Sequence, residues 1–413
     1  MDRRKFPLSR YLLSFLPRKV RFAVMRNQLK VTQILDSRFT FKIARSQAEL
    51  SDAYRILHDS YVELGYAVTQ ASGMRIVKYF ALPSTTTLIA LFDGKVVGTI
   101  SIIRRGSFGL PADSVFDVSE FVNRNEVIAE ISSLAIASDF RQKRGALFLP
   151  LLKYFWEYTE RFMTLDSIVI SVSPSMSDFY EGFLGFKRLP QAETAQYSFV
   201  NGVPAVGLYL NIKTAKKVFS DLYNHKKAEK NLYRYFVELK LAHFEFPNRE
   251  FYKSSDPVMS AAMLDFFFNT VSNVFSELTL NEKLGLSAVY PELNYRHVLP
   301  AIDLERQRQN IRHSVNLKCF ICFENKIEAK ALDISESGIC ITSDMKLSGI
   351  ILLQIRVADE RTAEVRGHVQ WENAKYNTYG IRILKTDAHW KDFVSYLLND
   401  FIALTNESIK KVS

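Results

Sequence analysis

Residues 127–146 read VIAEISSLAIASDFRQKRGA. The first half predicts a β-strand that is covered on both sides, because apolar side chains occur on both of its alternating faces. One carboxylate, Glu130, interrupts this strand on the face that it shares with Leu134 and Ile136. The second half is a basic loop in which Gly145 begins an amphipathic helix. The stretch therefore joins a candidate buried acid to a candidate anion site.

The basic loop has the composition of an anion-binding site. A glycine-containing loop before a helix offers free backbone N–H groups and the positive end of the helix dipole to a phosphate. Arg141, Lys143 and Arg144 add formal positive charge. The alternative carries equal weight: Glu130 is a core acid with satisfied hydrogen bonds, and the basic run is a solvated loop.

Composition indicates a globular protein with several cores. The chain has 413 residues, of which 47% are hydrophobic, and this length supports two or three ordinary domains. No run approaches the roughly 18 apolar residues of a membrane span, and no secretory signal is recognisable, so we expect a cytoplasmic protein. Cys319 and Cys322 lie in one predicted strand and point to opposite faces. Since no second cysteine pair exists, we predict no metal site.

Positive charge is concentrated near the N-terminus. Residues 1–45 contain twelve Lys or Arg but only two Asp, within a net charge of +10. The basic segment, assigned to residues 1–38, could lie on an anionic membrane surface. It could also bind an acidic protein such as an acyl carrier protein, or be a tail without a partner.

The region from residue 39 to 212 predicts a strand, a helix, paired strands, and then alternating strands and helices. Ser46 and Glu49 form a capping box that predicts the start of a helix reaching about Leu64. Asp93-Gly94 and Asn201-Gly202 predict the turns of two hairpins. The predicted strands are Phe39–Ile43, Thr85–Phe92, Lys95–Arg104, Val127–Ala137, Ser167–Val172, Tyr197–Val200 and Ala205–Ile212.

This order resembles the GNAT superfamily of acyltransferases. The strand-loop-helix around Glu130 and the run FYEGFLGF at residues 179–186 carry the resemblance. It implies an α+β fold, with a mixed central sheet and helices on both faces, in which the basic loop binds the acyl donor. Leu147 stands where the superfamily usually has a second small residue, which argues against ordinary coenzyme A use.

Two segments resemble one branch of that superfamily, the long-chain N-acyl amino acid synthases related to acyl-homoserine-lactone synthases. They are EISS at residues 130–133 and NGVPAVGLYL at residues 201–210. The resemblance implies transfer of an acyl group from acyl carrier protein or coenzyme A to an amino acid or similar amine. Glu130 is then the candidate base or amine-orienting group. Tyr180 is the candidate proton donor to the leaving thiol, and plain packing is a reading of Tyr180 with at least equal weight. The candidate acyl-donor-binding residues are Leu134, Ala135, Ile136, Arg141, Gln142, Lys143, Arg144, Gly145 and Ala146.

Residues 213–300 predict a helical connector that is rich in Phe and Tyr. The predicted helices are Thr214–Tyr223, Lys226–Leu241 and Val258–Phe275. The run Phe266–Phe268 is expected to be core or interface, and a lipid contact or acyl tunnel is the less weighted alternative.

The last region, residues 301–413, contains a second set of candidate ligand-binding residues. Arg308 and Arg312 are followed about twenty residues later by Asp333, Ser335 and Gly338. Two arginines four residues apart can present planar forks to phosphate oxygens or guanine edges. Predicted strands follow at Ile350–Val357, Arg361–Trp371 and Tyr379–Leu384, and then an amphipathic helix with Trp390, Phe393, Val394, Leu397, Leu398 and Phe401.

The combination resembles PilZ domains, small bacterial β-barrels that bind cyclic di-GMP. The resemblance implies that Arg308 and Arg312 clamp phosphate and guanine. It also implies that Asp333 and Ser335 position the other base and that Gly338 permits a close turn.

The leading hypothesis is a cyclic di-GMP-regulated N-acyltransferase of the bacterial cytoplasm, with peripheral contact to the inner membrane left open. We expect no nucleic acid polymer as partner. One alternative is a coenzyme A-dependent N-acetyltransferase. Another is a catalytically inactive GNAT-like receptor that binds cyclic di-GMP and a partner protein.

Overall fold

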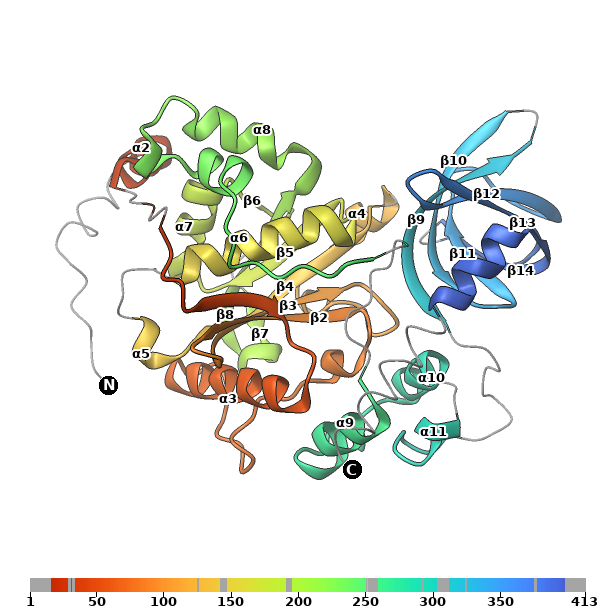
Figure 1. Cartoon of the computed structure of the whole chain (residues 1–413), viewed down its shortest axis with the longest axis horizontal. Helices are drawn as coiled ribbons and strands as arrows, with labels where there is room; N and C mark the ends of the chain where they lie inside the picture. The colour runs from red at the N-terminus through yellow and green to blue at the C-terminus, as the bar shows by residue number, and fades with distance from the viewer. Residues whose placement is uncertain are drawn as a thin grey trace.

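The structure is a computed structural model that describes residues 16–28, 31, 34–124, 126–141, 147–190, 195–249, 251, 259–290, 293–302, 312–323, 325–374 and 377–397. Within these residues, a mixed sheet with helices on both faces lies beside a closed β-barrel, and a helical connector lies below the sheet (Figure 1). The α+β class predicted for the first domain and the barrel predicted for the last are both confirmed.

The sheet of the first domain is antiparallel except at one pair. β4 (Ile128–Ile136) and β5 (Ser167–Val172) run parallel at its centre. Asp93 and Gly94 connect β2 to β3 with φ values of 50° and 76°, which is the left-handed backbone that an Asp-Gly hairpin turn needs. The strand order is β1 (Phe39–Ile43), β2 (Thr85–Phe92), β3 (Lys95–Arg104), β4, β5, β8 (Val203–Asn211) and β6 (Lys187–Arg188), and β7 (Ala195–Tyr197) also pairs with β8.

Helices cover both faces of this sheet (Figure 1). α3 (Gln47–Glu63) covers one face and begins at the predicted capping box of Ser46 and Glu49. On the other face lie α6 (Phe148–Tyr158), α7 (Pro174–Leu184) and α8 (Ile212–Tyr223). The shorter helices α2 (Arg18–Gln28), α4 (Ser119–Asn123) and α5 (Ser138–Arg141) complete the domain.

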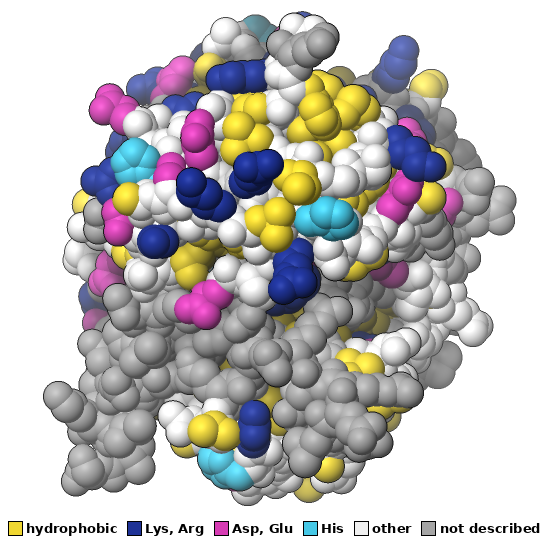
Figure 2. Space-filling model, turned by 90° about the vertical axis from the view of Figure 1, so that its right-hand side faces the viewer, with side chains coloured by type: hydrophobic (Ala, Val, Ile, Leu, Met, Phe, Trp, Pro, Cys, Tyr) yellow, Lys and Arg dark blue, Asp and Glu magenta, His cyan; other side chains and the backbone are white. Residues whose placement is uncertain are grey.

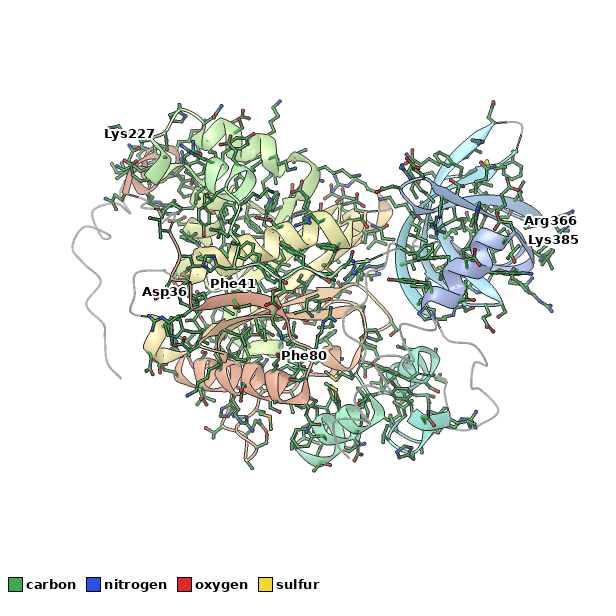
Figure 3. The ribbon with its side chains drawn as sticks, viewed as in Figure 1. Asp36, Phe41, Phe80, Lys227, Arg366 and Lys385 are labelled. Carbon is green, nitrogen blue, oxygen red and sulfur yellow. The ribbon has the colours of Figure 1, made fainter. Side chains whose placement is uncertain are left out.

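Each face has its own hydrophobic core. Phe41 belongs to the core beneath α6, and its ring lies 5.2 Å from that of Phe244. Phe80 belongs to the core beneath α3 and stacks on Tyr54 at 4.7 Å. Figure 3 shows Phe41 and Phe80 on opposite sides of the sheet. The sheet is therefore buried on both faces, as the apolar strand around Glu130 predicted.

The connector contains less helix than we predicted. Residues Lys226–Leu241 do not form one helix; they form two short turns, Ala228–Lys230 and Arg234–Glu238. The side chain of Asn231 accepts a hydrogen bond of 2.8 Å from the backbone N–H of Arg234, so a new turn starts there. Tyr235 and Phe236 are both buried in the core beneath α6, and the turn that carries them ends at Leu239, whose backbone is extended.

The aromatic run of the connector is core. The predicted helix Val258–Phe275 is shorter in the structure, with α9 (Ala261–Asp265) continued by a π-helical turn at Phe266–Thr270. Phe267 and Phe268 are completely buried in the core beneath α3. The remaining helices of the connector are α10 (Leu280–Val289) and α11 (Leu293–Arg296).

The C-terminal barrel closes in the order β10, β11, β14, β13, β12, β9. Its core includes Trp390, Phe393, Val394 and Leu397 from a helix at residues 388–397, whereas Leu398 and Phe401 lie outside the described residues. The strands are β9 (His313–Cys322), β10 (Lys326–Ile334), β11 (Gly338–Thr342), β12 (Ile350–Ala358), β13 (Arg361–Asn373) and β14 (Thr378–Thr386).

Charges are mixed on the outer side of the barrel. Figure 2 shows basic side chains interspersed with acidic and apolar ones on the described part of this face. Arg366 and Lys385 pair in register across β13 and β14 at the end of the molecule far from the first domain (Figure 3). Among the described residues, no helix is long and apolar enough to cross a membrane.

Candidate functional site

The centre of the sheet opens where β4 bulges. The pairing of β3 with β4 shifts register between Thr99 and Ser101, and Ser133 of β4 has a positive φ of 57°. β4 pairs with β5 only over Ile128–Ile131, so the two parallel strands separate beyond that point. A bulge of this kind redirects side chains and leaves backbone groups of the strand without ladder partners. Ser133 and Leu134 of β4 and Val172 of β5, which lie beyond the paired residues, line a cavity.

Glu130 lies at this point, and its side chain is 2% exposed. Three donors bind its carboxylate: the backbone N–H of Ala112 at 2.6 Å, the hydroxyl of Tyr197 at 3.0 Å and that of Ser171 at 3.2 Å. Burial raises the pKa of Glu130 to about 7, although these hydrogen bonds oppose the rise. Near neutral pH this carboxyl group can therefore both accept and release a proton.

The cavity beside Glu130 has a volume of about 490 Å³ and a mainly apolar lining. Phe148, Leu152 and Phe155 line it from α6, and Tyr180 lines it from α7. The structure thus brings both predicted catalytic residues to one cavity. Burial raises the pKa of Tyr180 above its usual value, so its hydroxyl keeps its proton at neutral pH.

The predicted acyl-donor residues divide into four groups. Leu134 lines the cavity, whereas Ala135 and Ile136 pair with Thr99 and Gly98 of β3. Arg141 binds α3: its Nη2 donates to Ser60 Oγ at 3.0 Å, and its Nη1 forms an ion pair with Glu63. Gln142, Lys143, Arg144, Gly145 and Ala146 lie outside the described residues. The anion site at this loop stays a prediction.

Sequence reasoning did not find three polar residues at this site. Tyr197 and Ser171 bind the Glu130 carboxylate from the closing hairpin and from β5. Tyr61 lines the same cavity from α3. Each comes from a segment distant in the chain, and none belongs to a spacing pattern that marks it in the sequence.

The basic N-terminal segment is partly engaged within the chain. α2 lies against α7: Arg21 pairs with Asp178 at 2.9 Å, and Arg26 donates to the carbonyl of Gly182 at 2.8 Å. Arg18 forms an ion pair with Glu181. These contacts use acidic and carbonyl groups of the first domain. Residues 1–15 lie outside the described residues, so a membrane or carrier-protein contact of this segment stays a prediction.

The predicted nucleotide residues meet at the turn between β10 and β11. Arg312 Nη1 binds Asp333 Oδ1 at 2.6 Å. The backbone N–H of Ser335 donates to the carbonyl of Gly338 at 2.8 Å, which closes a tight turn. A Cβ at Gly338 would lie 3.3 Å from the carbonyl oxygen of Ile381, so the glycine permits a close approach of backbones. Arg308 lies outside the described residues.

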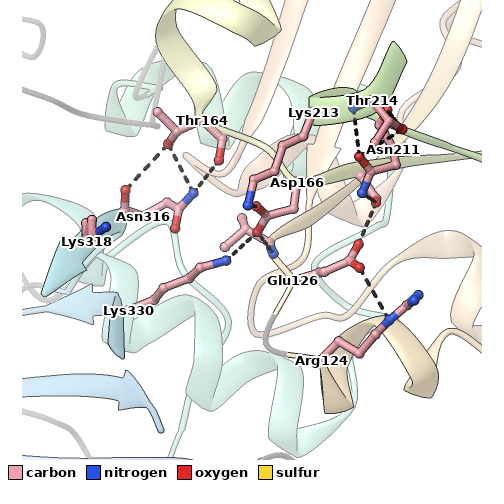
Figure 4. Close-up of polar contacts among 12 residues, drawn as sticks. Arg124, Glu126, Thr164, Asp166, Asn211, Lys213, Thr214, Asn316, Lys318 and Lys330 are labelled. Atoms are coloured by element: carbon pink, nitrogen blue, oxygen red, sulfur yellow. Dashed lines mark hydrogen bonds and ion pairs between the residues drawn. The ribbon is translucent and has the colours of Figure 1, made fainter. Parts of the chain in front are cut away.

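The barrel contacts the first domain through a polar cluster (Figure 4). Lys330 of β10 binds Asp166 Oδ2 at 2.5 Å. Asp166 also accepts 2.7 Å contacts from the Val127 backbone N–H and from Lys213, so it links β4, α8 and the barrel. Asn316 of β9 donates to the backbone and side-chain oxygens of Thr164.

A buried arginine makes a second contact between the domains. Arg104 ends β3, is 4% exposed and donates to the carbonyl of Val315 in β9. Burial lowers the pKa of Arg104 to about 10, although the negative charge of Asp333 opposes this shift. The neighbouring β3 residue, Ile103, pairs with Glu130. One strand therefore connects the predicted nucleotide residues to the candidate base.

The thiol of Cys319 is buried in the barrel. Burial raises the pKa of Cys319 to about 12, so it is a poor thiolate at neutral pH. In the part of the chain that the structure describes, no three His, Cys, Asp or Glu side chains are arranged to hold a metal ion.

Comparison with known proteins assigns both domains. The sequence model of the family described as N-acyl amino acid synthase FeeM matches residues 52–211, and that of the PilZ domain matches residues 306–398. Comparison with curated protein sequences gives no match.

Three solved structures illustrate the likeness. FeeM, an N-acyl amino acid synthase from uncultured soil microbes, is 26% identical over 44% of this chain and 94% of its own, with a TM-score of 0.38. The acyl-homoserine-lactone synthase LasI is 18% identical over 44% and 95%, with a TM-score of 0.35. An acyl-CoA N-acyltransferase from Pseudomonas aeruginosa is 16% identical over 43% and 99%, with a TM-score of 0.28. On the family matches, residues 52–211 are an N-acyltransferase domain of the N-acyl amino acid synthase family, and residues 306–398 are a PilZ domain.

Proposed function

We propose that this chain transfers a long-chain acyl group from acyl carrier protein or coenzyme A to the amine of an amino acid or similar compound. Cyclic di-GMP bound at the barrel regulates the transfer. The observation that carries the first part is Glu130, a buried carboxyl group with a pKa of about 7 at the wall of an apolar cavity. The amine of an amino acid is protonated at neutral pH and has to lose a proton to act as a nucleophile, and a base of this kind can accept that proton.

The chemistry follows from the groups around the cavity. The amine nitrogen attacks the thioester carbonyl, the C–N bond forms, and the amine proton passes to the Glu130 carboxylate. Backbone N–H groups of β4 beyond the bulge donate to the oxyanion. The C–S bond then breaks, and Tyr180 gives its proton to the thiolate. The raised pKa of Tyr180 keeps its hydroxyl in the protonated form that a proton donor needs.

The cavity favours a long acyl chain over an acetyl group. Its lining includes Leu152, Phe155, Trp156 and Phe219, whose side chains offer an alkyl chain contacts but no hydrogen bonds. Each CH₂ group buried there contributes about 0.8 kcal/mol to binding. Acetyl transfer would leave most of this surface unused.

The activity is testable with the full chain and a matched pair of variants. Purified wild type, Glu130→Gln and the exposed control Glu120→Gln are supplied with acetyl and long-chain thioesters on both carriers and with the proteinogenic amino acids. We expect long-chain N-acyl amino acids by mass spectrometry, with kcat/KM about 10²–10⁴-fold lower in Glu130→Gln and unchanged in the control.

Three results would count against the proposal. Products limited to N-acetyl compounds would favour the acetyltransferase. The absence of any product from the wild type would favour the inactive receptor. Long-chain products at full rate from Glu130→Gln would remove Glu130 as the base.

Three features support regulation through the barrel. Arg312 and Asp333 form an ion pair of 2.6 Å, so a nucleotide that recruits Arg312 has to replace this contact. Asp333 also acts electrostatically on Arg104, at the end of the strand that pairs with Glu130. Lys330, on the same strand as Asp333, contacts Asp166 of the first domain. Coupling requires that the nucleotide binds two states of the enzyme unequally.

Two variants separate binding from coupling. Calorimetry should detect cyclic di-GMP binding to the wild type and not to Arg312→Ala. Lys330→Met should bind the nucleotide normally but lose its effect on acyl transfer, because it removes the contact with Asp166. Lys326→Met, exposed on the same strand, is the control. A nucleotide effect that survives unchanged in Lys330→Met would exclude this contact as the route.

A further inference from the structure

Arg75, in the loop after α3, is a cation that forms no ion pair with an acidic side chain of the described residues. Its Cζ lies 5.0 Å from the ring centre of Tyr61 and 5.1 Å from that of Phe199. Its Nη2 donates to the Phe199 carbonyl. Its Nε is buried and has no hydrogen-bond partner among the described residues. An unpaired, partly buried guanidinium is costly unless an anion completes its environment.

Arg75 lines a second cavity that adjoins the one beside Glu130. This cavity has a volume of about 500 Å³, and its lining is mainly polar. Tyr66 and Phe199 belong to the linings of both cavities. Glu277 also lines the second cavity but forms no ion pair with Arg75 in the described part of the chain. The site therefore offers positive charge at the side of the apolar cavity.

The closing hairpin connects Arg75 to the candidate base. Tyr197 donates to Glu130 at 3.0 Å, and Phe199, two residues later, accepts from Arg75. The hydroxyl of Tyr61 lies within electrostatic range of both charges: burial raises its pKa most, Arg75 lowers it and Glu130 raises it. A carboxylate thus lines the apolar cavity and a cation lines the polar one, and the two cavities share Tyr66 and Phe199.

We propose that Arg75 binds the carboxylate of an α-amino acid acceptor whose amine faces Glu130. This inference rests on the proposed function and names its acceptor class. An α-amino acid carries its carboxylate one carbon away from its amine, so the two recognising groups have to lie near each other. Arg75 also offsets the repulsion between the acceptor carboxylate and Glu130. Two aromatic faces fix the guanidinium plane, which lowers the entropy lost on binding.

The test compares acceptors with and without the carboxylate. The best amino acid, found by mass spectrometry from the proteinogenic mixture, is assayed beside its α-carboxamide. Enzymes are the wild type, Arg75→Gln, Arg75→Lys and the control Arg55→Gln, an exposed arginine of α3. We expect the ratio of kcat/KM for acid over amide to fall about 10- to 100-fold in Arg75→Gln, mainly through KM, and less in Arg75→Lys. The control should keep the wild-type ratio.

The outcomes separate this inference from the proposed function. An equal loss of kcat/KM for the acid and the amide in Arg75→Gln would mean that Arg75 is only structural. A wild type without preference for the acid would overturn the proposal while leaving acyl transfer intact. If no acceptor is acylated, the proposed function fails. Calorimetric binding of the free amino acids, lost in Arg75→Gln, would still support the carboxylate site, and its absence would end it. If Arg75→Gln does not fold, the test uses Arg75→Lys, which retains the charge without the planar fork. A ratio of kcat/KM for acid over amide below that of the wild type would support the proposal, and an unchanged ratio would overturn it.

Discussion

Glu130 should make the stability of the first domain depend on pH. Its pKa is about 7 in the folded chain against an ordinary value of 4.5, and this difference corresponds to about 3 kcal/mol. Because the folded state favours the protonated form, the stabilising contribution is complete below about pH 4.5 and is lost as the pH rises through about 7. Glu130→Gln cannot ionise, so its free energy of unfolding should gain about 3 kcal/mol relative to the wild type over this range.

The assay is urea unfolding at a series of pH values from about 4.5 to about 8. Trp156 lines the cavity beside Glu130, so its fluorescence reports the first domain when Trp371 and Trp390 of the barrel are replaced by Phe in every protein compared. Glu120→Gln should follow the wild type. A difference between the wild type and Glu130→Gln that stays constant from acid to neutral pH would refute the argument, since it would mean that Glu130 is ionised throughout.

Two further predictions concern packing around the same sheet. Lys153 is completely buried and pairs with Glu157 at 2.7 Å. Lys153→Met should therefore lower the free energy of unfolding by about 3–5 kcal/mol, and the double variant Lys153→Met with Glu157→Leu should recover most of this loss of stability. Equal urea midpoints for the single variant and the wild type would contradict this prediction. A Cβ at Gly182 would lie 2.9 Å from Phe22 Cδ1. Gly182→Ala should therefore loosen α2 from α7 and speed tryptic cleavage at Arg21 and Arg26. A cleavage rate equal to that of the control Ser175→Ala would disprove the contact.

Elements governed by short-range chemistry were predictable from the sequence. The Asp93-Gly94 turn and the capping box at Ser46 depend on residues within one turn, and both occur as predicted. The segment Lys226–Leu241 misled the prediction, because helical propensity does not reveal that Tyr235 and Phe236 both have to be buried beside α6. In that segment tertiary packing overrides local preference.

The candidate active site was predictable in part: Glu130, Leu134 and Tyr180 were named from the sequence, and all three line the cavity. A lone acid within an apolar strand is conspicuous, so Glu130 could be found, but its pKa depends on groups that the sheet order brings to it. Ser171 reaches it from β5 and Tyr197 from the closing hairpin. The same hairpin holds Arg75 through the Phe199 carbonyl. The proton affinity of Glu130 and the position of the Arg75 guanidinium therefore depend on one segment. If Arg75 binds the acceptor as proposed, a shift of this hairpin would alter base strength and acceptor recognition together.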